Sequence, residues 1–409
     1  MTPKVKKRLF DVFRIVVCIG ALWIVVQGVT FHDHITLEDG TPDLVGEVSD
    51  LPQDDGPIRI RLADGTVRVI PLDEIAVDED GAPMVVFGLK TAWRKSRKPL
   101  ILLAVIIYFP VVFLQGLRFR WLLLAQQINL SFWECVKLSW AGNFLNFATP
   151  LGSNAGDVFK AYFASLHTER KTEAATTVVL DRVIGLGCLL AVVGIIATFA
   201  SSGSRLGEFR PYVLGVLGAG LVGFLLYLSP WVRKHLVPWG WLMRLPMFEQ
   251  LRRIDVATRA LASHKTIVVG AVVVTVLLQA LAMGGYFTVA VALGLIANAG
   301  NILEYYAYFY IGAVVQALPG PPQGLGTVEL VYRYFLAPFG NPSQIVCVAV
   351  IARLVALVSA LPGLLVTVTG SYKPREATPW PKGFDGIGGV ASDSPQEVST
   401  ESPSGDGVR

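Results

Sequence analysis

The chain has 409 residues, of which 53% are hydrophobic, and its mean hydropathy is +0.54. Only 16% of the residues are charged, against roughly 25% in a typical soluble protein. These values exclude a single soluble domain, and the small net charge of +4 gives no reason to expect a nucleic-acid partner.

Recurring apolar runs predict membrane-spanning helices. Each is long enough, or nearly so, to cross about 30 Å of hydrocarbon. They occupy residues 15–29, 100–117, 174–200, 211–228, 266–296 and 345–368. No small-x-small cleavage site follows the first run, so residues 1–30 are expected to be an uncleaved span rather than a signal peptide. The pattern is typical of an all-α polytopic membrane protein.

The segment 31–91 differs from the rest of the chain in composition and in its hydrophobic pattern. It contributes 14 of the chain's 31 acidic residues, all between His32 and Asp80. Alternating apolar and polar residues on both sides of Asp64-Gly65 are typical of a β-hairpin with a type I′ turn. We expect about five short strands in a small β-rich extracytoplasmic insertion. His32-Asp33-His34 could form part of a metal site, but the start of a solvated strand is the simpler interpretation. No metal or cofactor is predicted.

Two of the later apolar segments are broken by glycine and proline in corresponding places, and polar residues flank each break. The residues of the first are Asn143, Asn146, Pro150, Gly156, Asp157 and Lys160, and those of the second are Pro319, Gly320, Gly324, Gly326 and Glu329. Paired interruptions of this kind point to a transporter binding site, in which two helix N-termini face an anion. The alternative is that glycine and proline only mark bent helices that pack closely.

The distribution of basic residues predicts the topology. The loop 231–265 carries seven basic residues against two acidic ones and is expected in the cytoplasm. That placement requires both broken segments to be re-entrant hairpins, one dipping from each face, beside about six full spans. Both termini are then cytoplasmic in the cell membrane. The basic cluster 94–98 lies outside, against the same rule.

Ionisable residues inside the spans are costly and normally pair or line a cavity. Asp181 and Arg182 lie in the third apolar run and Arg353 lies in the last one. Glu329 and Arg333 are spaced i, i+4 on one helix face. Structural ion pairs between helices are the alternative interpretation, and Asp157 and Glu329 would serve equally as plain N-caps.

The two broken segments resemble the motifs of a known family. The stretch from Gly142-Asn143 to Pro150 and on to Gly156-Asp157, together with Leu318-Pro319-Gly320 and the following Gly324 to Glu329, is similar to the lysylphosphatidylglycerol synthetase transmembrane family, or flippase-like domain. Arg120-Trp121 and Asp181-Arg182 also fit its pattern. Lys160 stands where arginine is usual, which keeps the charge but loses the bidentate fork.

The resemblance covers about residues 9–30 and 99–370 and implies translocation of a lipid or a lipid-linked sugar. Together with the buried charges, it leads us to expect translocation or binding of a phospholipid or a lipid-linked anionic substrate. It implies no synthase activity, because the tail 371–409 is too short and polar for an aminoacyl transferase domain and is expected to be disordered in the cytoplasm. Residues 92–370 form the expected flippase-like domain. The sequence leaves open whether the protein forms a homo-oligomer or binds a partner enzyme.

The expected site is one polar cavity near the middle of the membrane. Asp157, Lys160 and Glu329 are expected inside it, with Arg182 or Arg353 at its wall. Two other functions compete with translocation. An integral-membrane enzyme acting on a lipid phosphate would need a nucleophile–base pair or a metal cluster, and the histidines all fall outside the apolar runs. A membrane anchor for the β-rich insertion would need neither buried charges nor paired breaks.

Overall fold

A computed structural model describes most of the chain between residues 32 and 370. The described ranges are 32–38, 43–50, 57–62, 64–76, 85–86, 88–148, 155–168, 170–201, 203–228, 264–298, 300–317 and 322–370. The expected first span, the C-terminal tail, nearly all of the basic loop, and Pro150, Pro319 and Gly320 lie outside these ranges.

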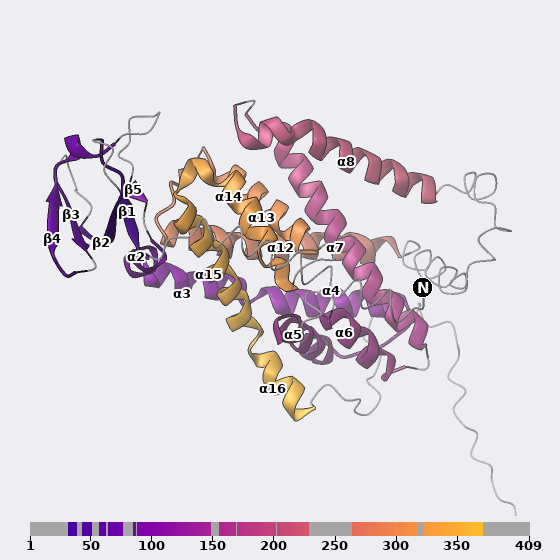
Figure 1. Cartoon of the computed structure of the whole chain (residues 1–409). Coiled ribbons are helices and arrows are strands. Elements are labelled where there is room, and N and C mark those ends of the chain that lie inside the picture. Colours follow the sequence, from indigo (N-terminus) through magenta and orange to yellow (C-terminus); the bar gives the residue numbers. More distant parts are fainter. Residues whose placement is uncertain are drawn as a thin grey trace, which may run out of the picture.

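The predicted β-rich segment forms one antiparallel sheet in the order β4-β3-β2-β1-β5 (Figure 1). Its strands are β1 (Asp33–Ile35), β2 (Leu44–Asp50), β3 (Ile58–Leu62), β4 (Val67–Ile70) and β5 (Val85–Val86), with a 3-10 turn η1 (Leu72–Glu74) after β4. The alternation places Ile58 and Ile60 in a core with residues of the neighbouring strands, while Arg59 and Arg61 are exposed.

The β3–β4 turn differs from the predicted type I′ turn. That type needs a positive φ at both central residues. Among the described residues of the turn, only Gly65 has one, at 86°. Leu62 N donates to Thr66 O at 2.9 Å, and Thr66 N donates to the Asp64 carboxylate at 2.9 Å. The connection is therefore longer than two residues, and Asp64 stabilises it through its side chain.

Asp33 joins the sheet to the helices, so the expectation of a solvated strand start is wrong for this residue. Its carboxylate is fully buried and accepts hydrogen bonds from Val48 N at 2.6 Å, Gly88 N at 2.7 Å and Thr91 Oγ1 at 2.9 Å. These donors come from β2 and from the start of α2 (Leu89–Lys95). Buried carboxylates are stable only when hydrogen-bonded in this way.

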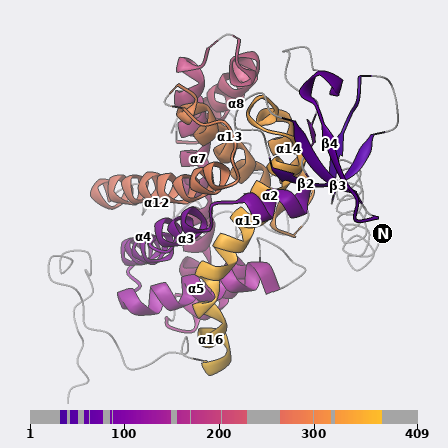
Figure 2. The ribbon, with the colours of Figure 1, turned by 90° about the vertical axis from the view of Figure 1, so that its left-hand side faces the viewer.

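The rest of the described chain is helical (Figures 1 and 2). Its helices are α3 (Lys98–Tyr108), α4 (Val111–Ala125), α5 (Phe132–Ala148), α6 (Ala155–Ser165), α7 (Lys171–Phe199), α8 (Arg205–Leu228), α12 (Lys265–Ala292), α13 (Ile302–Ala317), α14 (Thr327–Phe335), α15 (Pro342–Ala360) and α16 (Pro362–Thr369), with 3-10 turns η3 (Pro322–Gly324) and η4 (Ala337–Phe339).

Within the described residues, four helical stretches are long and apolar enough to cross a membrane, namely Lys98–Ala125, Lys171–Phe199, Lys265–Ala292 and Pro342–Ala360. They coincide with four of the six predicted runs. A fifth run, 211–228, lies within α8. The chain is therefore a multi-pass membrane protein with a small antiparallel sheet.

Prolines break two of the predicted spans. Pro110 separates α3 from α4, and Pro362 separates α15 from α16. Proline lacks the N–H that would continue the helical ladder, and its ring clashes with the preceding turn. After the second break, α16 packs on α5, with Gly363 directly against the Trp140 carbonyl and Trp140 Nε1 donating to Ser359 O at 3.2 Å.

Three helix ends meet at one end of the helical part. Arg97 N donates to Ala292 O at 2.8 Å, and Gln344 Nε2 donates to Leu293 O at 3.3 Å. The start of α3, the end of α12 and the start of α15 thus meet at the end that carries the sheet (Figure 2). Aromatic rings of α13, α14 and η4, including Tyr305 stacked on Phe339, fill the core beneath this end.

Candidate functional site

The first broken segment is a tight pair of helices, α5 and α6. A Cβ on Gly156 would lie 2.2 Å from the Gly142 carbonyl oxygen, so only glycine allows this approach. Asn146 Oδ1 accepts a hydrogen bond from Gly156 N at 2.7 Å. The bond satisfies one of the free N–H groups in the first turn of α6. Asp157 and Lys160 follow in that helix.

The second broken segment, α13–η3–α14, is fixed by an ion pair. Gln323 and Gly324 both have positive φ angles, 53° and 63°. Arg353, on α15, donates to Gln323 O at 3.3 Å and to Gly324 O at 3.2 Å. Its guanidinium also pairs with Glu329, at 3.0 Å between Nη2 and Oε2. Glu329 accepts from Gly326 N at 2.9 Å and so caps α14, pairing with Arg353 rather than with Arg333.

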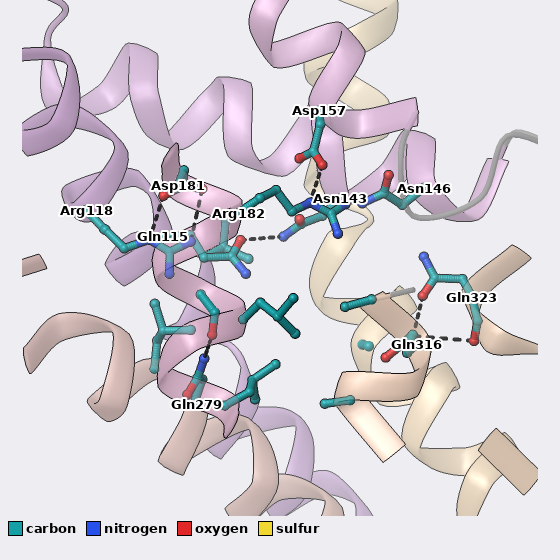
Figure 3. Close-up of a pocket in the computed structure, with 18 of the residues that line it drawn as sticks. Gln115, Arg118, Asn143, Asn146, Asp157, Asp181, Arg182, Gln279, Gln316 and Gln323 are labelled. Carbon is teal, nitrogen blue, oxygen red and sulfur yellow. Dashed lines mark hydrogen bonds and ion pairs between the residues drawn. The ribbon is translucent and has the colours of Figure 1, made fainter. Parts of the chain in front are cut away.

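A polar cavity of about 490 Å³ lies between these segments (Figure 3). Residues of both broken segments line it, together with residues of α3, α4, α7, α12 and α15. Its polar and charged lining residues are Tyr108, Gln115, Arg118, Asn143, Asn146, Asp157, Lys160, Asp181, Arg182, Gln279, Tyr286, Gln316 and Gln323.

Both carboxylates of the cavity are engaged by arginines. Arg118 Nε lies 2.6 Å from Asp181 Oδ1, and Arg118 Nη1 also donates to Thr275 Oγ1 at 3.1 Å. Arg182 pairs with Asp157 across α7 and α6 (Figure 3). Charges buried at these positions are costly unless they are paired. The two pairs therefore leave no free carboxylate among the described lining residues.

Lys160 differs from these residues. It lines the cavity and is 7% exposed, yet it makes no hydrogen bond or ion pair with any residue that the structure describes. Its Nζ lies 6.0 Å from the centre of the Phe119 ring, a distance at which the ring contributes only weakly. Lys160 is thus a cation that faces the cavity with its donors available.

The cavity contains six of the predicted site residues. These are Asn143, Asn146, Asp157, Lys160, Asp181 and Arg182. Gly156 serves the contact between α5 and α6. The remaining predicted residues are not part of the cavity lining but hold η3 and the start of α14 in place. They are Gly324, Gly326, Glu329 and Arg353. Glu329 was expected inside the cavity; it is instead 3% exposed and turned toward Arg353, because it caps its own helix.

The sequence interpretation missed Arg118 and four glutamines, Gln115, Gln279, Gln316 and Gln323. Arg118 lies one residue beyond the predicted apolar run 100–117 and was therefore not expected inside the membrane. The helix continues to Ala125, and the apolar residues Leu122 to Leu124 were the signal for this. Glutamines carry no charge and gave no comparable signal. Across the described residues, no group of three histidine, cysteine, aspartate or glutamate side chains is arranged to hold a metal ion.

Comparison with known families agrees with this architecture. The family model described as lysylphosphatidylglycerol synthase TM region matches residues 84–363, which include both broken segments and every residue of the cavity. No curated protein matches the chain. The match covers more than half of the sequence, and the chain belongs to the lysylphosphatidylglycerol synthase transmembrane-region family.

Proposed function

We propose that the cavity binds the anionic headgroup of a membrane lipid or lipid-linked substrate and carries it across the cell membrane. The observation that supports this best is the charge of the lining. Arg118, Lys160 and Arg182 face only two carboxylates, and both carboxylates are paired with the arginines. The remaining cation, Lys160, has its donors free for a phosphate, and a charge-assisted hydrogen bond is among the stronger polar contacts.

The arrangement of the breaks also supports transport. Secondary transporters place substrates where discontinuous helices meet, at the interface of two halves. Here α6 begins beside the cavity from one side, and η3 with Gln323 contributes its wall from the other. In our proposal both broken segments are re-entrant hairpins and six helices span the bilayer. The termini and the basic loop are then cytoplasmic, and the sheet is extracytoplasmic.

Non-helical backbone inside a membrane must be covered by protein or by a water-filled cavity. The contacts around η3 meet this requirement, because Arg353 satisfies the carbonyls of Gln323 and Gly324.

We further propose that the protein acts without covalent chemistry. Asp157 and Asp181, the carboxylates in the cavity, are engaged in ion pairs rather than set beside a nucleophile.

The test is a sidedness assay in proteoliposomes with fluorescent phosphatidic acid. Lys160→Met is expected to lower the rate of headgroup transfer by about tenfold or more, since a charge-assisted hydrogen bond contributes roughly 1.5–3 kcal/mol. Lys137→Met is the matched control, because Lys137 lies on α5 outside the cavity lining. Recovered lipid is expected to be chemically unchanged by mass spectrometry.

Equal rates for the wild type, Lys160→Met and protein-free vesicles would refute translocation through this cavity. A modified headgroup in the recovered lipid would instead identify an enzyme.

A further inference from the structure

A cluster of basic residues lies where the sheet joins the helices (Figures 1 and 2). Residues 89–98 contain no acidic residue and five basic ones, which are Lys90, Arg94, Lys95, Arg97 and Lys98. All five are exposed, and none of them lines the cavity. The proposed topology places them outside, where the positive-inside rule expects few basic residues. Neither topology nor the cavity therefore accounts for the cluster.

The α2–α3 junction (Trp93–Lys98) lies where membrane-spanning helices end. Arg97 N donates to Ala292 O at 2.8 Å, so the residue before the span Lys98–Ala125 contacts the last residue of the span Lys265–Ala292. The start of α15 contacts the same end of α12 (Figure 2). Three of the four candidate spans among the described residues thus end at one level. The headgroup region of the bilayer, roughly 5–7 Å deep in each leaflet, begins there.

Trp93 has the properties of a residue at this depth. It is 46% exposed, and Lys98 Nζ lies 3.4 Å from the centre of its ring. The same ammonium donates to Trp93 O and to Ser96 Oγ, the latter at 2.7 Å. Lys98 therefore holds the indole at the surface of the protein. An exposed indole is well placed at a membrane interface, where its ring contacts apolar groups and its N–H contacts polar ones.

Two of the five cations attach the sheet to α2. Lys90 pairs with Glu47 of β2, and Arg94 Nη1 lies 3.3 Å from the same carboxylate. Arg94 Nη2 also donates to Val48 O at 3.2 Å. One carboxylate balances only one of these two charges, so the attachment itself keeps an excess of positive charge.

The rest of this end of the helical part adds no compensating charge. The guanidinium of Arg97 makes no hydrogen bond or ion pair with any residue that the structure describes. The connecting segments 293–301 and 336–341, which meet at the same end, contain no charged residue. The junction therefore presents uncompensated cations beside an exposed tryptophan at the level of the headgroups.

We propose that the α2–α3 junction binds the headgroups of anionic phospholipids in the leaflet on the side of the sheet. Basic clusters next to a membrane-spanning helix are attracted to anionic lipid surfaces. A soluble acidic protein would have to enter the headgroup region to reach Trp93, so the lipid is the better match. Because Lys90 and Arg94 join the sheet to the same helix, bound lipid anchors the sheet at the membrane surface. The inference is independent of the proposed function, since the site lies outside the cavity.

The test uses the purified full chain in nanodiscs. Photoreactive phosphatidylglycerol and phosphatidylcholine carry the same reactive group near the glycerol backbone, and crosslinks within residues 89–98 are quantified by mass spectrometry. Phosphatidylglycerol is expected to give about fivefold more crosslinks or better at low salt, since each cation near an anionic surface contributes roughly 1 kcal/mol. In 1 M salt the ratio of the two yields should approach one, because the Debye length is then about 3 Å.

Two substitutions at one position separate charge from structure. Arg97→Gln is expected to lower the yield ratio by about fivefold, as the loss of one cation implies. Arg97→Lys keeps the charge and should keep the ratio. Arg68→Gln is the matched control, because Arg68 is an exposed cation on the edge strand β4, which β3 separates from β2.

Equal yields from the two probes in the wild type at low salt would overturn the inference, and so would an unchanged ratio in Arg97→Gln. Lys160→Met is expected to keep the ratio, whatever it does to headgroup transfer. A ratio that falls in Lys160→Met would show that the crosslinks report lipid in the cavity, and the separate surface site would then be refuted.

Discussion

Arg353 Nη2 lies 3.0 Å from Glu329 Oε2, so a residue of α15 stabilises the first turn of α14. The same guanidinium donates to the carbonyls of Gln323 and Gly324. The ion pair therefore positions Gln323 in the cavity wall without reaching the cavity itself.

Arg353→Met is expected to destabilise the protein, because removal of one partner leaves Glu329 buried and unpaired, at a cost of about 3–5 kcal/mol. Thermal unfolding in detergent, followed by size-exclusion chromatography, measures the effect. Arg333→Met is the control, since Arg333 lies on the same helix as Glu329 and pairs with no described residue. Equal melting temperatures for the two variants would show that the pair contributes little.

Gly156→Ala should separate α5 from α6. The new methyl group would lie 2.2 Å from the Gly142 carbonyl oxygen, and overpacking of this kind costs about 1–3 kcal/mol. Gly187→Ala, on α7, has no atom within 4 Å of the added carbon and is expected to be neutral or slightly stabilising. The comparison needs only the two melting temperatures. A Gly156→Ala protein as stable as Gly187→Ala would mean that the helix pair tolerates a wider separation.

The proposed topology predicts sidedness. Single cysteines introduced at Gln53, Gln250 and Asp393, positions outside the described residues, should react with an impermeant maleimide from the outside, the inside and the inside, respectively. A background without native cysteines removes the buried Cys135, Cys188 and Cys347 as well as Cys18. External labelling at Gln250 would contradict the re-entrant assignment of α5 and α6.

Acid is expected to loosen the sheet. The hydrogen bond from Lys90 lowers the pKa of Glu47 below its ordinary value of 4.5, and hydrogen bonds from Thr66 lower the pKa of Asp64. A carboxylate whose pKa is lower in the folded state stabilises it fully above the unfolded pKa, and this stabilisation is lost as pH falls through the folded pKa. Hydrogen exchange in β2, corrected for intrinsic rates, should therefore accelerate on acidification.

Glu47→Gln should lose part of that acid response, because it cannot take up the proton. Asp73→Asn is the control, since Asp73 is exposed and makes no hydrogen bond or ion pair with another described residue. An identical acid response in the wild type and Glu47→Gln would show that Glu47 has no role in it.

Long-range periodicity made much of the architecture predictable. Long apolar runs indicated four of the spans, and alternation around Asp64 indicated the strands. Asp181 and Arg182 were indicated because charges inside an apolar run are energetically costly, and Lys160 was indicated by its place beside the first Gly/Pro break. The roles of Glu329 and Asp33 were not predictable in the same way. Each depends on partners far away in the chain, Arg353 for Glu329 and Gly88 and Thr91 for Asp33.

Asn143 and Asn146 were predicted from their place beside the first break, but the four glutamines of the cavity lining were not. Glutamine and asparagine are common at helix surfaces and carry no charge that a membrane would penalise strongly. Only the packing of α4, α5, α12 and η3 brings Gln115, Asn143, Gln279 and Gln323 to one cavity. The prediction of a type I′ turn at Asp64-Gly65 was wrong for a related reason. A dipeptide does not specify how many residues between the two strands remain unpaired.

The break at Pro362 gives the last two helices a shared mechanical role. On the N-terminal side of this break, α15 binds the second broken segment through hydrogen bonds from Arg353. On the other side, α16 lies against α5 of the first, with Gly363 pressed on Trp140. A displacement of either broken segment that preserved these contacts would also displace the chain around Pro362. The two broken segments are thereby linked through α15 and α16, and in the proposed transport cycle a movement of one segment would be transmitted to the other.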